Sequence, residues 1–563
     1  MNAGRAATAG AALAWTLLCL RWFDDAAPLR PGWLSSVPPL VLAIVTAALV
    51  TPFLWRFASA LRAHEAGGAR GGALLVTLLA VAFRLPLAWH GAAGYLTADG
   101  ALSGIVALRA RSGASHLVFV PHVAYSGSLK SHLTAALATV IDPARAFALV
   151  SVLFYAAFVA AVYRLALLAC GERAEKARVA LAAGLYLAFA PPFLTRYSLS
   201  NDGNYVEALA FGAWALVAAE RWGAVPRSRL TVAGGIGLLL GLALWCHLLA
   251  LIPAVTVAIA LVFSDARAAL RSAPVLAAGG VAGYLPGLLW NATHGWESVR
   301  YLWPGEIGTV GPPAKAAAML REQWPVLAGY DPGYGGLADA ALRVYAWCAL
   351  LLFAVSVVAA AAGARRATPG LRLLLLLLGV NLAFAVLVLP DVPGNPRYLL
   401  FSMIALPVFV ARLLAPGRGR IALAALIGFG AFGSLAQAPG AFEADRRWRE
   451  FVASLEAEGV RHCFTDFYLA TKIDFLSQER IVCSSKLGPT TTEYFFEYRE
   501  QTERAPQAAL VAVNPTAAEK LERRLERLGV TYERRDLMKP VLLRLSRKVD
   551  PAELFPGHSF PLR

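Results

Sequence analysis

Long apolar runs, each about the length of a membrane-spanning helix, alternate with short polar connections over the first 440 positions of the chain. A spanning helix needs roughly 20 predominantly apolar residues. This pattern predicts thirteen spanning helices, with the weakest patterns in the first segment and in the pair within 231–263. The predicted segments are 6–23, 37–58, 73–93, 144–168, 179–197, 204–220, 231–246, 247–263, 273–293, 341–362, 373–390, 398–414 and 421–438.

The first apolar segment has the length of a secretory signal peptide. No clear small-residue cleavage site follows it, and Arg21, Trp22 and Asp24 mark its end. We therefore expect it to remain in the protein as a helix.

The pattern changes after residue 440, where short apolar runs of two periodicities replace the long ones. Helical and strand-like periods alternate there, which is typical of a small α/β domain outside the membrane. The predicted helices are 445–458, 466–477, 491–504 and 515–528, and the predicted strands are 460–464, 480–484, 508–513, 530–535 and 540–546.

These patterns together predict an all-α polytopic membrane protein with a small C-terminal extramembrane α/β domain. Three regions follow along the chain. Residues 1–72 form two extra N-terminal helices, 73–439 form the membrane core, and 440–563 form the α/β domain. The core carries two large outer loops, 94–143 and 294–340. In the first loop, the amphipathic stretches 100–111 and 126–140 are too short or too polar to span, so we expect helices that lie along the interface with an apolar face in the lipid.

Composition supports this fold class. The chain has 58% hydrophobic and only 16% charged residues, whereas soluble globular proteins have roughly 45–50% apolar and about 25% charged residues. An ordinary cytosolic enzyme and a disordered chain are both excluded. The net charge is +16, which in a soluble domain would suggest binding to nucleic acid.

The basic residues instead mark one side of the membrane. The domain after residue 440 has 20 Lys and Arg against 19 Asp and Glu, so nearly all of the net charge lies in the membrane part. Cytoplasmic loops are enriched in Lys and Arg. We therefore expect no nucleic-acid partner, a cytoplasmic amino terminus and an extracytoplasmic C-terminal domain. Sixteen basic residues lie in six alternate short loops: Arg62, Arg70, Arg173, Lys176, Arg178, Arg221, Arg227, Arg229, Arg267, Arg271, Arg365, Arg366, Arg372, Arg412, Arg418 and Arg420.

Two of the six cysteines, Cys463 and Cys483, lie in successive predicted strands of this domain. In an oxidising compartment they either form a disulfide or remain as two buried thiols. No Cys and His cluster has the spacing of a zinc site.

The acidic residues of the membrane part gather at the predicted outer ends of helices and in outer loops, as Asp99, Asp202, Glu297, Glu306 and Asp391 do. No acid falls clearly at the middle of a span, where an ion-coupled transporter usually holds one. Polar chemistry is therefore expected on the outer face, and the pattern argues against a transporter.

Several polar motifs follow one another in a fixed order along the core. Each is weak alone, and the order and topological placement carry the signal. The motifs are Arg84-Leu85, Asp99 in the first outer loop, Tyr125-Ser-Gly127, SNDGNYVEALAFGAWAL (200–216), GLLLGLALWCHLL (237–249), LPGLLWNATHGWESV (285–299) and PGNPRYLLFSMIALPVF (393–409).

With these motifs the chain resembles the polytopic glycosyltransferases of the C-type fold. It is most similar to the bacterial relatives of protein O-mannosyltransferases and of the lipid A aminoarabinose transferase, the family 39-like enzymes. The resemblance covers most of residues 73–440. It implies a bacterial inner membrane and an inverting transfer of sugar on the outer face. The donor is a polyprenyl-phosphate-linked sugar, and the acceptor is a hydroxyl of a lipid, glycan or protein.

The resemblance also implies roles for charged residues. Asp99 is the expected base that removes the acceptor proton, and helix capping is its structural alternative. Arg397, next to Tyr398, is the first choice for binding the donor phosphate. Its alternative is an interfacial arginine that reaches toward the headgroups. Arg84 and Lys130 are secondary phosphate candidates, and Arg84 equally fits a structural pairing.

Six residues are expected to line the sugar or acceptor pocket. Capping is the alternative for Asp202 and Asn204, and a solvated loop charge is the alternative for Glu306. A Trp in the position of Trp245, beside His247, usually belongs to the aromatic belt of a membrane protein. The pocket residues are Tyr125, Asp202, Asn204, Tyr205, His247 and Glu306.

Two further points stay open. The strongest members of the family have two adjacent acids in the first outer loop, whereas Gly100 follows Asp99 here. No metal site is therefore assigned, and the need for a divalent metal is undecided. The alternative functions are a transporter or flippase of lipid-linked envelope precursors, which predicts internal repeats, and a non-catalytic envelope assembly protein.

Overall fold

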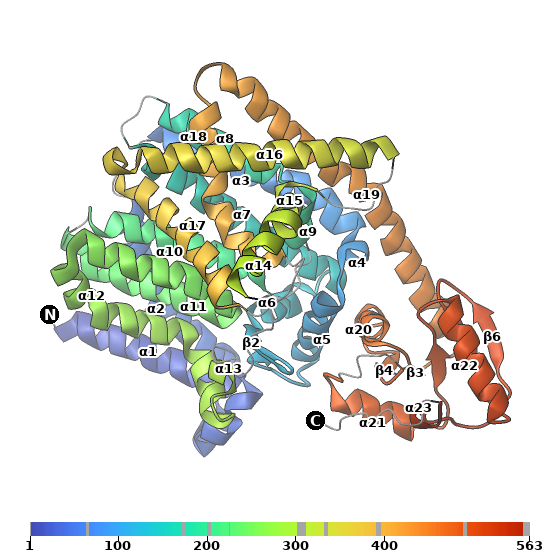
Figure 1. Cartoon of the computed structure of the whole chain (residues 1–563). Coiled ribbons are helices and arrows are strands. Elements are labelled where there is room, and N and C mark those ends of the chain that lie inside the picture. Colours follow the sequence, from blue (N-terminus) through green and yellow to red (C-terminus); the bar gives the residue numbers. More distant parts are fainter. Residues whose placement is uncertain are drawn as a thin grey trace.

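The computed structural model describes residues 2–62, 67–171, 175–199, 204–224, 226–300, 311–330, 336–389, 396–487 and 493–554. A large helical part and a small α/β domain are visible in Figure 1. The helical part contains α1 (Asn2–Trp22), α2 (Pro39–Arg62), α3 (Gly67–His90), α4 (Ala92–Tyr95), α5 (Ala98–Ser112), β1 (Phe119–Val120), β2 (Val123–Gly127), α6 (Leu129–Leu137), α7 (Pro143–Cys170), α8 (Lys176–Ala188), α9 (Pro192–Tyr197), α10 (Tyr205–Trp222), α11 (Arg229–Cys246), η4 (Leu248–Ala250), α12 (Leu251–Thr293), α13 (Glu297–Arg300), α14 (Pro312–Ala318), α15 (Trp324–Ala328), α16 (Gly336–Ala362), α17 (Pro369–Leu387), η7 (Pro396–Ile404) and α18 (Leu406–Leu414).

The rest of the chain begins with one long helix and ends in a sheet with its covering helices. These elements are α19 (Arg420–Ala457), β3 (His462–Phe464), α20 (Phe467–Leu476), β4 (Val482–Ser484), α21 (Phe496–Arg504), β5 (Ala509–Val511), α22 (Pro515–Arg527), β6 (Glu533–Asp536), β7 (Pro540–Leu543) and α23 (Pro551–Leu554).

Each of the thirteen apolar segments coincides with helical structure. Among the described residues, eight helices are long and apolar enough to cross a membrane, or nine if η7 and α18, bent by 51°, form one span. The number is lower than thirteen partly because α8 has only 13 residues and because the described side chains of α1 form only a shorter apolar helix, Gly10–Trp22. In addition, α12 joins two predicted spans, and its backbone breaks at Asp265 (φ −162°, ψ 90°). The chain is an integral membrane protein of the predicted all-α polytopic class.

Helices α11 and α12 approach each other through small residues. A Cβ atom on Gly237 would lie 2.0 Å from the carbonyl oxygen of Leu276, and one on Gly241 would lie 2.2 Å from that of Gly280. Glycines four residues apart allow backbones of membrane helices to come this close, which increases their van der Waals contact. Gly237 and Gly241 therefore form the surface through which α11 packs against α12.

The first outer region differs from its prediction. Residues 126–140 were expected to form an amphipathic interfacial helix, but the segment starts in the antiparallel pair β1–β2 and only then forms α6. Helix α5 was expected to lay an apolar face in the lipid. Its residues are instead buried on almost every side within the protein, including Ile105 and Val106. It packs between the membrane part and the C-terminal domain.

The C-terminal domain is a five-stranded mixed sheet with the strand order β4-β3-β5-β7-β6. Strands β4, β3 and β5 are parallel, whereas β7 pairs antiparallel with β5 and β6. Alternate residues face opposite sides: Cys463 and Val511 pack with α19 and α20, and Phe464 and Leu510 pack with α22. The domain is thus a three-layer α/β structure, as the interleaved pattern predicts.

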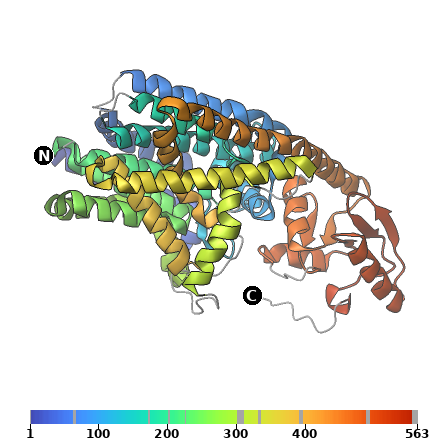
Figure 2. The same cartoon turned by 45° about the horizontal axis from the view of Figure 1, so that its top comes forward.

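Helix α19 connects the membrane part to this domain without a break, so the expected boundary at 440 falls inside a helix. Figures 1 and 2 show it running from the bundle to the domain. The helix is held halfway along, where the N–H of Ala93 in α4 donates to Oδ1 of Asp445 (2.7 Å). Arg449 in turn pairs with Asp142 (3.1 Å), the residue that caps α7. The domain is therefore fixed against the end of the bundle that carries α4 and the start of α7.

Candidate functional site

An aromatic cluster forms around His247, at the junction between α11 and η4. The His247 backbone bridges to Ser126 of β2, and its Nδ1 accepts a hydrogen bond from the N–H of Leu249 (3.1 Å). Its ring lies 4.2 Å from the ring of Tyr205 and 5.5 Å from that of Tyr125. Three segments far apart in sequence thus meet at one buried imidazole.

Asn204 holds the start of α10 against the end of β2. Its Nδ2 donates to Oγ of Ser126 (3.0 Å) and to the carbonyl oxygen of Gly127. The backbone is left-handed (φ +57°), a conformation that Asn adopts more easily than most residues. The Asn204 side chain makes no capping bond to α10, so the capping alternative does not describe it. It places Tyr205 against His247.

Gly127 ends the Tyr-Ser-Gly motif because the chain passes very close to α11 there. A Cβ at this position would lie 2.2 Å from the carbonyl oxygen of Trp245. The indole Nε1 of Trp245 donates to the carbonyl of Val118 (3.1 Å). Trp245 is buried, so it holds the β1–β2 segment and does not belong to an exposed aromatic belt.

Arg397 provides a cation beside this cluster. Its guanidinium carbon lies 5.9 Å from the centre of the Tyr205 ring and 5.5 Å from that of Tyr398. The side chain is half-buried. The backbone of η7 is held because Asn381 Nδ2 donates to the carbonyl of Tyr398 (2.9 Å) and Ser402 Oγ donates to Asn381 Oδ1 (3.1 Å). A partly exposed guanidinium on an aromatic wall can bind an anionic oxygen group.

Lys130 forms a buried ion pair in the same region. Its Nζ lies 3.6 Å from Oε1 of Glu207, with both side chains fully shielded from solvent, and 4.2 Å from the centre of the Phe147 ring. This pair joins α6 to the first turn of α10, which also carries Tyr205.

Arg84 connects α3 to the end of α8 and to Ser198. It is fully buried; its Nε donates to Oγ of Ser198 (2.6 Å), and its Nη atoms donate to the carbonyls of Ala188 (2.7 Å) and Leu187 (3.3 Å). Its guanidinium also lies 3.9 Å from the centre of the Tyr155 ring. These contacts close the end of α8, so we do not carry Arg84 forward as a phosphate ligand.

Asp99 is exposed in the first turn of α5. The cap of this helix is Thr97, whose hydroxyl accepts a hydrogen bond from the N–H of Gly100 (3.1 Å). Capping therefore does not account for Asp99. One turn further on, the carbonyl of Ser103 accepts a hydrogen bond from Oγ of Ser131 (2.8 Å). The helix that carries Asp99 thus lies beside the helix that carries Lys130.

Comparison with solved structures identifies the fold. No family model matches the chain, and no curated protein matches its sequence. ArnT from Cupriavidus metallidurans bound to undecaprenyl phosphate aligns over 83% of this chain and 97% of its own length, with 13% identity and a TM-score of 0.52. Its apo form aligns over the same shares at 12% identity and a TM-score of 0.52. The Archaeoglobus fulgidus oligosaccharyltransferase in its apo form aligns over 79% and 69%, with 13% identity and a TM-score of 0.48.

The chain has the C-type glycosyltransferase fold. At this level of identity the likeness establishes the architecture, and the chemistry has to be argued from this chain's own residues.

Within this C-type fold, the structure brings most of the predicted pocket and phosphate residues together. Lys130 is linked to this group through its ion pair with Glu207, which lies on α10 with Tyr205. Asp202 and Glu306 lie outside the described residues. Tyr125, Asn204, Tyr205, His247, Arg397 and Tyr398 form one cluster.

The sequence analysis did not select two residues of this region of the C-type fold. Glu207 is the partner of Lys130, and Tyr197 lies 5.8 Å, ring to ring, from Tyr205. A lone acid in the first turn of an apolar helix was the available signal for Glu207. Nothing in the sequence pattern marks Tyr197.

No three His, Cys, Asp or Glu side chains within the described ranges converge in a way that could hold a metal ion.

Proposed function

We propose that this protein is a membrane glycosyltransferase that moves a sugar from a polyprenyl-phosphate carrier to an acceptor hydroxyl on the outer face of the membrane, with inversion. The observation that carries the proposal is the position of Arg397 at an aromatic cluster within a C-type fold. The fold supports the lipid carrier, because the ArnT structure that it resembles is bound to undecaprenyl phosphate.

In this proposal Arg397 binds the phosphate of the donor lipid. Charge builds up on the departing phosphate as the glycosidic bond breaks, and a fixed guanidinium stabilises that charge more in the transition state than in the ground state. The half-buried setting of Arg397 leaves its outer side accessible. Tyr398 and Lys130 are further candidates for the phosphate site, Lys130 after release from Glu207.

Asp99 is the proposed base. Its carboxylate removes the proton of the acceptor hydroxyl while the oxygen attacks the anomeric carbon from the side opposite the phosphate. Exposure at the start of α5 supports this role, because an acceptor that arrives from outside the membrane can reach it.

The sugar lies between these two groups. Tyr125, Tyr205 and His247 supply an aromatic and polar wall, and Asn204 keeps that wall in place. We retain Asp202 and Glu306 as pocket candidates on sequence grounds.

We propose that the amino terminus faces the cytoplasm and that the C-terminal domain is extracytoplasmic in a bacterial inner membrane. The loop charges support this orientation. The disulfide between Cys463 and Cys483 also supports it, because such bonds persist in oxidising compartments.

The test uses the full-length protein in proteoliposomes with a labelled polyprenyl-phosphate sugar and an envelope extract that offers lipid, glycan and protein acceptors. We expect sugar transfer by the wild type. Asp99→Asn should reduce the rate between about a hundredfold and ten-thousandfold, the range for loss of a general base, without weakening donor binding. Arg397→Ala should weaken binding of undecaprenyl phosphate.

The exposed Asp536 on the edge strand β6 provides a matched control, since Asp536→Asn should leave transfer unchanged. Transfer at the wild-type rate by Asp99→Asn would remove Asp99 from the base role. Movement of the labelled lipid across the bilayer with no transfer to any acceptor would favour a flippase and would reject the proposal.

A further inference from the structure

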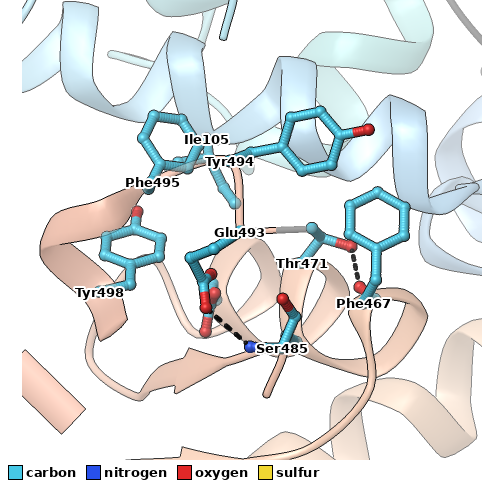
Figure 3. A pocket seen from close by; sticks show the side chains of 10 residues that line it. Ile105, Phe467, Thr471, Ser485, Glu493, Tyr494, Phe495 and Tyr498 are labelled. Atoms are coloured by element: carbon cyan, nitrogen blue, oxygen red, sulfur yellow. Dashed lines mark hydrogen bonds between the residues drawn. The ribbon is translucent and has the colours of Figure 1, made fainter. Parts of the chain in front are cut away.

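A small cavity separates α5 from the C-terminal domain. Figure 3 shows Ile105 of α5 on one side and the domain side chains Tyr494, Phe495 and Tyr498 around it. The space open to the centre of a water molecule is about 10 Å³, which is close to the volume that one ordered water needs. Two carboxyl groups, Asp474 and Glu493, line this cavity.

Asp474 is almost completely buried in α20 (2% exposed). Its Oδ1 accepts a hydrogen bond from the N–H of Cys483 (2.8 Å). Burial raises its pKa well above the ordinary value, the carboxyls of Glu493 and Glu479 act in the same direction, and the Cys483 bond opposes them. Asp474 therefore favours the protonated form while the cavity stays closed.

Glu493 enters the same cavity from the segment before α21. Its Oε2 accepts hydrogen bonds from Oγ of Ser484 (2.7 Å) and from the N–H of Ser485 (3.0 Å). Burial raises its pKa to about 7, and the two serines act against that shift. Two carboxyls in one poorly solvated space do not ionise together at neutral pH, because each negative charge disfavours the other.

The charged and titratable groups around the pair belong to the contact between α5 and the domain. Arg109 of α5 pairs with Glu479 (3.2 Å) and Glu497 and stacks on Phe495. Tyr498 donates from its hydroxyl to Glu479 (2.5 Å), and Arg499 of α21 lowers the pKa of Glu493. Ionisation of the pair thus adds negative charge to an interface where one arginine of α5 already meets two glutamates.

The same interface is closely packed beside the cavity, which has room for about one water. Phe475 of α20 covers Gly104 of α5, where a Cβ would lie 2.6 Å from the phenyl ring. Arg111 of α5 donates to Oε1 of Gln478 (2.9 Å). Full solvation of an ionised Glu493 therefore requires the domain to move relative to α5.

We propose that Glu493 and Asp474 form a proton-dependent latch: while both carboxyls hold their protons the domain stays docked on α5, and loss of the proton of Glu493 loosens the docking. The docked form binds more protons than the open form, so a rise in pH favours opening. The glutamate titrates from its ordinary value of 4.5 when solvated to about 7 when docked. The stabilisation is complete below the lower value and is lost as the pH rises through about 7.

Helix α5 also carries Asp99, so any effect of the latch on catalysis rests on the proposed function. The latch does not rest on it, and the test below uses no sugar substrate.

The test is hydrogen–deuterium exchange of the full-length protein in nanodiscs at pH about 6 and about 8.5, corrected for intrinsic exchange. The segments followed are 97–112 and 467–476. In the wild type we expect protection to fall about tenfold at the higher pH, because about that part of the effect of the shift from 4.5 to about 7 falls between these two pH values. Glu493→Gln keeps a neutral hydrogen-bonding group in the cavity, so its protection should be nearly equal at both pH values.

Asp474→Asn is the second variant; it keeps a neutral group beside Glu493, so the pH response should remain. The exposed Glu519→Gln on α22 is the matched control, and it should behave like the wild type. Equal protection of the wild type at both pH values would overturn the proposal. So would a wild-type loss of protection in Glu493→Gln, or an absent pH response in Asp474→Asn.

Discussion

Arg84 lies within one predicted apolar segment and Arg397 directly before another, and both were candidates for binding the donor phosphate. In the structure Arg84 satisfies the carbonyls at the end of α8, whereas Arg397 is half-buried on an aromatic wall. The sequence marked each arginine as a cation with a role at its position in the fold. It did not predict the partners, because these lie more than a hundred positions away in the case of Arg84 and Ser198.

This difference predicts opposite behaviour for two variants. Arg84→Leu leaves buried carbonyls without a donor, so unfolding should become easier by about 3 kcal/mol or more, with a lower Tm in detergent. The folded fraction should bind undecaprenyl phosphate as the wild type does. Arg397→Leu should show the reverse, a nearly unchanged Tm and weak phosphate binding. A phosphate-binding defect in folded Arg84→Leu would contradict this division of roles.

The ion pair of Lys130 and Glu207 predicts a double-variant effect. Removing one partner leaves a buried charge uncompensated, which costs about 3–5 kcal/mol, whereas replacing both with apolar residues can cost little. Lys130→Met and Glu207→Leu alone should therefore each lower the Tm strongly, and the double variant should recover much of the loss. Additive losses measured by thermal unfolding would show that the two side chains do not depend on each other.

At the scale of elements, apolar periodicity located the long helices of the bundle but not the short ones such as α4 and α15, and alternating periods located the five strands of the C-terminal sheet. The β1–β2 pair was missed because its strands have only two and five residues and stand beside an amphipathic run. The break at Asp265 was anticipated, since a polar gap separated two predicted spans there. The burial of α5 was not, because its cover comes from a domain almost 400 residues further along.

The close contact of α11 with α12 predicts a strong effect of a small change. Gly241→Ala places a methyl group 2.2 Å from the carbonyl oxygen of Gly280, so the helices must separate. We expect a loss of about 1–3 kcal/mol, the usual cost of overpacking, seen as a lower Tm. Gly379→Ala on α17 is the control, because nothing lies within 4 Å of its added carbon. Its Tm should be equal or slightly higher, since Ala favours helix more than Gly does.

At the scale of the whole molecule, the charge distribution predicted the division into a basic membrane part and a nearly neutral exported domain. How the two are joined was not visible in the composition, because a continuous helix such as α19 reads as a span followed by a separate amphipathic helix. The pairing of Cys463 with Cys483 was one of two open readings, and the parallel register of β3 and β4 places the two residues opposite one another.

The disulfide predicts both the location and part of the stability of this domain. It closes a loop of 20 residues, and cross-links of that size stabilise by about 3 kcal/mol in the chain-entropy description. The Cys463→Ser/Cys483→Ser variant should lower the unfolding temperature of the domain. When the wild-type protein is taken from cells, denatured without reductant and treated with maleimide, Cys463 and Cys483 should stay unlabelled. The exposed free Cys348 serves as the labelling control; modification of all three would contradict an extracytoplasmic domain.

The unbroken course of α19 has a mechanical consequence. A helix of 38 residues is about 57 Å long and turns by about 100° with each residue, so the rotational phase of the domain is set by the helix that anchors it. One alanine inserted after Glu450, ahead of the α19 residues that pack in the domain core, should turn the whole domain away from α5 while the residues that meet α4 keep their places. Exchange at 97–112 would report the separation. An ordinary flexible linker would absorb such an insertion. In this protein the number of residues between the membrane part and the sheet therefore determines the orientation of the C-terminal domain.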